Sequence, residues 1–183
     1  MRHDRTGRRA IRRQGGQQGR RCGDGGRRNG QSPVAAAVGI VSRIHRARRL
    51  ALQGLCLLDV QGDRAADMAE GFIAESRSDA QTHQLARQLL SDVRADLEAC
   101  DATLAEYARH WQLNRLALVD RNILRLAVCE LRAKSAPPRV VIAEALKLAE
   151  EFSTAESPRF VNGILDAVAR DLYGEIAGGS EDQ

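Results

Sequence analysis

Apolar residues recur along the chain at three- and four-residue spacing, and they are densest at residues 120–134. The apolar positions there are Ile123, Leu124, Leu126, Ala127, Val128, Cys129 and Leu131. A helix that is apolar on nearly every side must be surrounded by other elements of the fold. The pattern therefore predicts a central helix, with Asp120 as its N-cap, that stops before Pro137 and Pro138.

Glu130 does not fit a pure core helix, because its carboxylate lies between Cys129 and Leu131. Two interpretations stay open. Either Glu130 faces water or pairs with a neighbouring arginine, or it is a charged contact point held at the edge of the core for a partner.

Helical spacing continues on both sides of this stretch. From Arg43 onward one stripe contains Ala47, Leu50, Ala51, Gly54, Leu55 and Leu58. Further helices are predicted over 68–75, with Met68, Phe72 and Ile73 facing inward, over 79–109, over 140–152 and over 157–173. The 79–109 pattern is one helix or two, with a break at 100–103, and Trp111 and Leu113 are expected to hold the following turn against the core. Because no segment alternates with the period of two typical of a strand, we predict an all-α bundle of about six to seven helices.

The N-terminal residues have a different composition. Residues 1–32 contain eight Gly and ten Arg and almost no apolar side chains, so they cannot bury enough surface to offset ordering. We interpret residues 1–42 as a disordered basic arm that holds RNA by charge, or as an extension from a wrongly assigned start codon. A helical domain over 43–175 and a flexible tail over 176–183 complete the predicted organisation.

The net charge of +4 hides an uneven distribution. Residues 1–42 hold ten of the 28 basic and two of the 24 acidic groups, which leaves 18 basic and 22 acidic groups in residues 43–183. The basic character therefore belongs to the N-terminal residues, and the pI alone does not indicate nucleic-acid binding.

One basic cluster nevertheless lies in the helical region. Arg43, Arg46 and Arg49 follow one ridge of the first predicted helix, with His45 and Arg48 on its flank. Cations at the N-terminal end of a helix oppose its macrodipole, so stability alone does not select this placement. A solvated basic face and an anion-binding face are both open, and five basic groups within seven residues favour anion binding.

The sequence contains no recognisable catalytic motif. The four cysteines form no C-x-x-C pair, no histidine lies at metal-ligand spacing from them, and no glycine-rich loop joins a strand to a helix. We expect no catalytic residue, metal or cofactor, and a binding module is favoured. The cysteine spacing favours a reducing, cytoplasmic compartment, and no apolar run has the length of a membrane span.

Four ordered blocks carry a family resemblance. They are R-A-R-R-L-A-L-Q-G-L at 46–55, D-R-N-I-L-R-L-A-V-C-E-L at 120–131, V-V-I-A-E-A-L-K-L-A at 140–149 and F-V-N-G-I-L-D at 160–166. Together they resemble the NusB family of transcription antitermination factors, over roughly residues 43–173. The resemblance implies a helical fold of two small bundles and no enzymatic activity. It also implies binding of boxA-type single-stranded leader RNA of ribosomal RNA operons together with NusE, a small-subunit ribosomal protein, to keep the RNA polymerase elongation complex transcribing.

The resemblance, together with the basic ridge that includes Arg43, assigns residues to two surfaces. The RNA-binding residues are Arg43, Arg46, Arg48, Arg49, Arg159 and Phe160, and the partner-binding residues are Glu130, Arg125, Cys56 and Glu156. The chain departs from the family at Cys56 and Cys129, where tyrosine is common, and this puts the NusE contact at Cys56 in question.

Two other functions stay open. Similar helical domains are fused to ribosomal RNA cytosine methyltransferases, so the chain could be a stand-alone RNA-holding domain that assists such an enzyme. It could also be a helical scaffold with a purely protein partner. The composition suits a monomer and a homodimer equally.

Overall fold

The computed structural model describes residues 33–107 and 115–174, and every α-helix in these stretches belongs to one helical body. The elements are α1 (Pro33–Gln61), the 3₁₀ turn η1 (Gly62–Ala65), α2 (Ala66–Glu75), α3 (Ala80–Ala95), α4 (Leu97–Tyr107), α5 (Leu118–Arg132), α6 (Pro138–Phe152) and α7 (Ser157–Tyr173). The predicted all-α fold is confirmed, with seven α-helices in the described residues. None of these helices combines the length and apolar character that a bilayer crossing requires.

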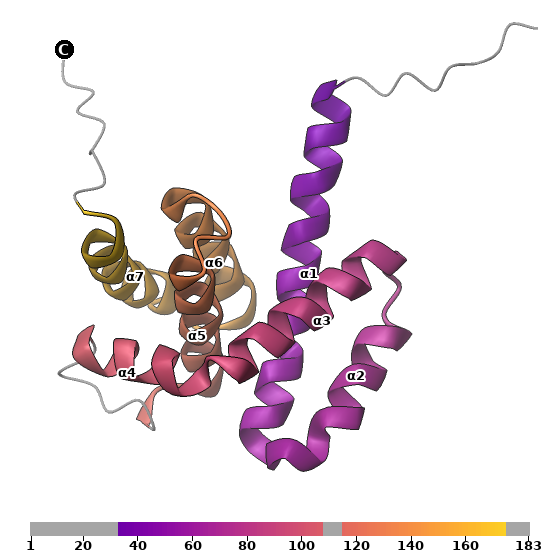
Figure 1. Cartoon of the computed structure of the whole chain (residues 1–183), viewed down its shortest axis with the longest axis horizontal. Coiled ribbons are helices and arrows are strands. Elements are labelled where there is room, and N and C mark those ends of the chain that lie inside the picture. Colours follow the sequence, from indigo (N-terminus) through magenta and orange to yellow (C-terminus); the bar gives the residue numbers. More distant parts are fainter. Residues whose placement is uncertain (1–32, 108–114, 175–183) are drawn as a thin grey trace, which may run out of the picture. The chain divides into compact units, whose positions relative to one another are not determined.

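Helix α5 is the centre of the fold, as the sequence predicts. It packs against α1, α3, α4, α6 and α7, and Figure 1 shows it between α1 and α7. Ile123, Leu124, Val128 and Leu131 are completely buried there. Helices α1, α2 and α3 contact one another on one side, while α6 and α7 contact each other on the other side.

The ends of α5 differ slightly from the prediction. The helix begins at Leu118, with Ala117 rather than Asp120 at the N-cap position. Asp120 lies in the first turn and is buried. Its Oδ2 accepts a hydrogen bond from Ser157 of α7 at 3.0 Å, which satisfies this oxygen in place of water. After α5, Pro138 occupies the first turn of α6, where a proline lacks no hydrogen bond that the helix needs.

Helix α1 begins ten residues earlier than the apolar pattern predicts. Pro33 suits the first turn of a helix, and the alanines at 35–37 have the highest helix propensity. In these extra turns Ile40 and Val41 are more than half exposed. These two apolar residues do not continue the core stripe, so the apolar periodicity does not predict this part of the helix. Residues 33–42 therefore belong to the helix rather than to the predicted arm, whereas the stripe from Ala47 to Leu58 faces the core as expected.

Helix α2 is turned by part of its circumference from the predicted face. Ile73 is buried as predicted, together with Ala69, but Met68 is 54% exposed and Phe72 is 39% exposed. The reason is the close approach of α1, where a Cβ at Gly54 would lie 3.7 Å from the Cβ of Ala69. Two small residues let the helices touch, and this contact selects the neighbouring ridge of α2 over the more hydrophobic one.

The long pattern over 79–109 is two helices, and the break lies at Asp96 rather than at 100–103. The backbone of Asp96 leaves helical geometry at φ −108° and ψ 19°. Its carboxylate accepts a hydrogen bond from Arg132 of α5, so the joint between α3 and α4 is fixed to the central helix. Trp111 and Leu113 lie outside the described residues.

Candidate nucleic-acid and partner surfaces

The basic cluster of α1 faces acidic residues of α6. His45 Nδ1 lies 2.7 Å from Glu144 Oε2, and Arg49 Nη2 lies 2.6 Å from Glu151 Oε1. The Arg49 guanidinium also stacks over the ring of Phe152, 5.5 Å from its centroid. Burial by itself raises the pKa of Glu144. Hydrogen bonds from Lys147 and His45 outweigh this effect, so the pKa of Glu144 lies below its ordinary value. Much of the positive charge of α1 is therefore neutralised within the protein.

Arg48 and Glu130, both assigned to binding surfaces by the resemblance, form an internal ion pair. Arg48 Nε and Nη2 donate to the two oxygens of Glu130 at 2.9 and 2.8 Å, and both side chains are buried. Glu144 Oε2 lies 3.6 Å from Arg48 Nη1. Of the two interpretations of Glu130, pairing with an arginine is the one seen in the structure, and a carboxylate in this position is not open to a partner.

The other two ridge arginines are more accessible. Arg43 Nε lies 3.3 Å from Asp79 Oδ2, across the gap between α1 and the start of α3. Arg46 is exposed and donates to Ser42 one turn earlier in the same helix. Hydrogen bonds from Thr82 lower the pKa of Asp79 to about 2, with a smaller contribution from Arg43. Among the predicted α1 residues, Arg46 is thus the one that presents its charge to solvent without a carboxylate partner in the described residues.

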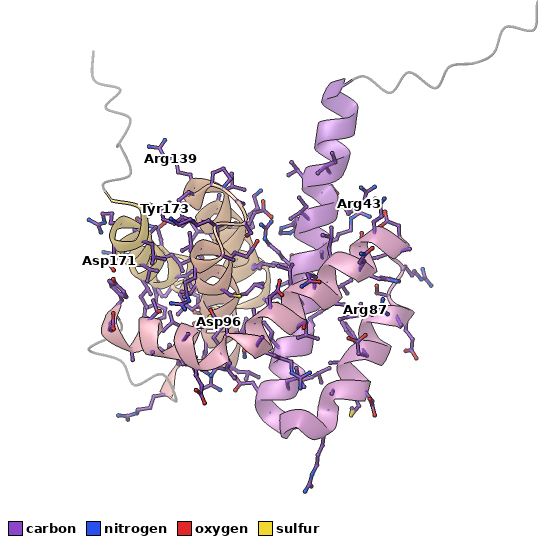
Figure 2. All side chains as sticks on the ribbon, in the orientation of Figure 1. Arg43, Arg87, Asp96, Arg139, Asp171 and Tyr173 are labelled. Atoms are coloured by element: carbon purple, nitrogen blue, oxygen red, sulfur yellow. The ribbon has the colours of Figure 1, made fainter. Side chains whose placement is uncertain are left out.

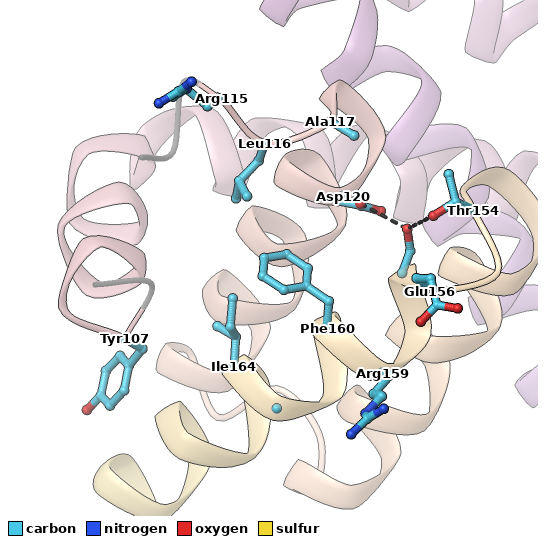
Figure 3. Close-up of a pocket in the computed structure, with 12 residues that line it drawn as sticks. Tyr107, Arg115, Leu116, Ala117, Asp120, Thr154, Glu156, Arg159, Phe160 and Ile164 are labelled. Atoms are coloured by element: carbon cyan, nitrogen blue, oxygen red, sulfur yellow. Dashed lines mark hydrogen bonds between the residues drawn. The ribbon is translucent and has the colours of Figure 1, made fainter. Parts of the chain in front are cut away.

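A pocket of about 620 Å³ opens where α4 ends, α5 begins and α7 begins (Figure 3). Its walls include Phe160, which is partly buried, and the exposed residues Arg159, Glu156 and Arg115. Arg159 and Phe160 are consecutive residues in the first turn of α7. In Figure 3 the Phe160 ring points toward Leu116. An aromatic ring between two exposed guanidinium groups is an arrangement that can accept an unpaired base and its phosphates.

The floor of this pocket is polar. Ser157 donates to Asp120 Oδ2 at 3.0 Å, and its hydroxyl also lies 2.9 Å from those of Ser153 and Thr154. The second oxygen of Asp120, Oδ1, is buried and has no hydrogen-bond partner among the described residues. It is an acceptor next to the pocket that an N–H or O–H donor could satisfy.

A second polar network joins α1, α4 and α5 around Asp59. Its carboxylate accepts from Arg121 at 2.8 Å and from Asn122 at 2.8 Å, and it pairs with Arg125 at 3.1 Å. Burial raises the pKa of Asp59, but the hydrogen bonds from the two arginines and the asparagine lower it overall. Arg125 also binds Asp101 of α4 through two contacts of 2.7 Å.

Cys56 lies beside this network. Burial, followed by the charge of Asp59, raises the pKa of the Cys56 thiol from 9.0 to about 11. Next to the network, a hollow of about 630 Å³ is lined by Leu58, Asp59, Leu97 and Arg125, among others. Two of the predicted partner residues, Cys56 and Arg125, are thereby brought to one place.

The predicted site residues fall into four groups, the first being Arg43, Arg46 and Arg49 on α1. Arg159, Phe160 and Glu156 share the pocket, Cys56 and Arg125 share the Asp59 network, and Arg48 with Glu130 is internal. The structure does not bring the α1 arginines to the pocket, since α5 lies between α1 and α7 (Figure 1).

Several residues of these sites are not predicted by the sequence pattern. The pattern predicts Asp120 only as a cap, and it does not single out Arg115, Asp59 or Asp101. Glu144 and Glu151 are seven residues apart and therefore share one face of α6. This spacing is a signal in the sequence for an acidic stripe on α6.

Comparison with known proteins links this geometry to one family. The NusB family model matches residues 45–170. The chain is 41% identical over 145 residues to the transcription antitermination protein NusB of Symbiobacterium thermophilum. The match covers 74% of this chain and 94% of that protein.

Two solved structures show the same likeness. The T. maritima NusB structure is 32% identical, with a TM-score of 0.62, and the match covers 70% of this chain and 91% of that chain. A structure of the antitermination factors NusB and NusE in complex with dsRNA is 26% identical, with a TM-score of 0.64, over 71% of this chain and 98% of that chain.

Proposed function

The chain belongs to the NusB family, and from this premise we propose that it is a transcription antitermination factor that binds RNA together with NusE. The names of its relatives and the NusB–NusE–dsRNA structure support this function. The proposed RNA is the boxA-type leader of ribosomal RNA operons, and the proposed outcome is continued elongation by RNA polymerase. We further propose that the protein acts by binding rather than catalysis, in the cytoplasm.

One observation carries the RNA site: the α4–α5–α7 pocket lined by Phe160 between the exposed guanidiniums of Arg159 and Arg115. An unpaired base can stack on an aromatic ring, and arginines can hold the phosphates on either side of it. Arg46 is the proposed contribution of α1. Arg43 and Arg49 could join it only by leaving Asp79 and Glu151, and Arg48 has a structural role.

For NusE we propose the surface formed by the Asp59 network, with Cys56 and Arg125. Its hollow combines apolar walls from Leu58 and Leu97 with charged groups, a mixture typical of protein interfaces. Glu156 lies at the pocket instead, so its partner role would require NusE to reach the RNA site. Glu130 is internal and is not part of this proposal.

The domain boundaries also stay a proposal. We propose residues 33–174 as the binding unit, since α1 includes residues 33–42. Residues 1–32 contain ten arginines, and we propose that their charge adds to RNA binding.

A binding titration tests the function. Labelled boxA-type RNA is titrated with the full chain, alone and with NusE, and fluorescence anisotropy is recorded. We expect weak binding alone and tighter binding with NusE. Phe160→Leu should weaken RNA binding about 5- to 150-fold, since stacking contributes about 1–3 kcal/mol per base. Arg170→Ala, an exposed change near the end of the same helix, is the matched control. No RNA retention with or without NusE would overturn the proposal.

A further inference from the structure

Two cysteines and one aspartate, distant in the sequence, meet where α3, α4 and α5 come together. Asp96 lies at the joint between α3 and α4, Cys100 one helical turn later, and Cys129 in α5. One ligand atom from each lies within 4.8 Å of the other two. Figure 2 shows Asp96 at the end of α3, in front of the central helix. None of these residues belongs to the surfaces proposed above for RNA or NusE.

The distances suit a small metal ion. Cys100 Sγ lies 3.8 Å from Asp96 Oδ2. In a tetrahedral zinc site, metal bonds of about 2.3 Å to sulfur and about 2.1 Å to oxygen place such atoms about 3.6 Å apart. The Cys100–Asp96 pair would therefore need to shift by only a few tenths of an ångström to hold a cation, and the Cys129 sulfur lies within 4.8 Å of both atoms.

The surroundings also suit the charge of such a site. Both cysteines are buried, whereas Asp96 is partly exposed, so water can reach the carboxylate side. Arg132 Nε binds Asp96 Oδ2 at 2.9 Å, and Arg132 Nη1 lies 3.4 Å from Thr103 Oγ1. Two thiolates and one carboxylate carry a charge of −3, which a divalent cation and Arg132 together balance. Arg132 would also orient the carboxylate, as groups around a metal ligand commonly do.

The two thiols lie near each other, with their sulfur atoms within 4.8 Å. A hydrogen bond between them lowers the pKa of Cys129 and raises the pKa of Cys100, to which burial also contributes. The positions of the three side chains, rather than these pKa shifts, indicate a shared ligand.

We propose that Asp96, Cys100 and Cys129 form a binding site for one thiophilic divalent cation of the zinc class, with a water molecule as the fourth ligand. Two sulfurs select a borderline-soft ion over Mg²⁺, which prefers oxygen ligands. Bound there, the ion would fasten the α3–α4 joint to α5. The sequence could not indicate this site, because the ligands are separated by four and by 29 residues.

The test is a titration of the full chain, in a non-chelating reductant, with Cd²⁺ and with Zn²⁺. Cd²⁺ binding is followed by the ultraviolet charge-transfer absorption of cadmium–thiolate bonds, and Zn²⁺ binding by the melting temperature. We expect one equivalent of Cd²⁺, a rise in melting temperature with Zn²⁺ that a chelator reverses, and no response to Mg²⁺. A missing absorption band, or a response to Mg²⁺ equal to that of Zn²⁺, would overturn the proposal.

Variants separate this site from the other two cysteines. The double variant Cys22→Ser/Cys56→Ser retains only Cys100 and Cys129 and should bind like the unmodified chain. Cys100→Ser and Cys129→Ser should each lose more than about 100-fold in affinity, because altering groups outside the ligand shell already costs 10- to 100-fold. Asp96→Asn should weaken binding while circular dichroism shows the same helix content. Cadmium binding lost in the Cys22/Cys56 variant, or kept in Cys100→Ser, would refute the site.

Discussion

Arg48 of α1 and Glu130 of α5 form a two-contact ion pair, at 2.9 and 2.8 Å, inside the helical body. Both residues were expected on binding surfaces, and in the structure each satisfies the other. Because the pair joins α1 to the central helix, its first consequence is for stability.

We predict that breaking this pair destabilises the fold. Arg48→Met leaves the Glu130 carboxylate buried without its partner, and Glu130→Leu leaves the buried guanidinium with only the 3.6 Å contact to Glu144. Each should lower the free energy of unfolding by about 3–5 kcal/mol. The double variant Arg48→Met/Glu130→Leu should lose less than the sum of the two. Urea denaturation measures all three, and single variants as stable as the unmodified chain would contradict the prediction.

The second prediction concerns the charge that α1 presents to RNA. Arg46 is exposed, so Arg46→Ala should remove one phosphate contact and flatten the salt dependence of RNA binding by about 0.7 in log–log slope. Arg170→Ala serves as the control and should leave the slope unchanged. Fluorescence anisotropy at a series of salt concentrations gives both slopes. Equal slopes for Arg46→Ala and the unmodified chain would exclude Arg46 as a phosphate contact.

The third prediction is a pH dependence at the start of α3. Asp79 caps this helix by accepting from Thr82 N and Oγ1, both at 2.7 Å, and its pKa falls from 3.8 to about 2. Since the folded-state pKa lies below the unfolded value, the ionised cap stabilises the fold above pH 3.8. This contribution is lost as the pH falls from 3.8 through about 2.

The variant Asp79→Asn keeps a good capping side chain but cannot titrate. Its unfolding free energy should therefore change less between these pH values than that of the unmodified chain. Denaturation at a series of acidic pH values measures the difference. Identical pH profiles would show that Asp79 does not contribute.

The fourth prediction is low reactivity of Cys56. Its pKa rises from 9.0 to about 11, which lowers the thiolate fraction near neutral pH by about 100-fold, and the thiolate is the reactive form. Alkylation of Cys56, followed by peptide mass spectrometry, should be correspondingly slow although the residue is only partly buried. Asp59→Asn removes one charge that raises this pKa, so the same reaction should become faster. Alkylation at the rate of an unhindered free cysteine would contradict the pKa shift.

The periodicity of apolar residues correctly predicted the features of the fold that repeat within one helix. The apolar stripe of α1 and the dense apolar pattern of α5 repeat within single helices, so they are visible in the sequence. The inward face of α2 is different, because it depends on the contact between Gly54 and Ala69, two residues in different helices. Hydrophobicity alone selected Met68 and Phe72 instead.

The candidate sites show the same limit. Phe160, Arg159 and Glu156 are close in sequence, and their shared location could be expected. The pairing of Arg48 with Glu130 joins positions 82 residues apart, and the acidic face of α6 meets α1 only through tertiary packing. A pattern of arginines shows how much charge a helix carries, but it cannot show which charges the protein itself neutralises.

The contacts between α1 and α6 have a consequence for discrimination. RNA that approaches His45 or Arg49 must compete with Glu144 and Glu151, which already contact these two side chains. An arbitrary polyanion gains little from that exchange, whereas RNA that also fits elsewhere on the protein can favour it. The carboxylates of α6 would thus reduce non-specific binding of nucleic acid to α1, although the sequence of α1 alone resembles that of a simple polycation.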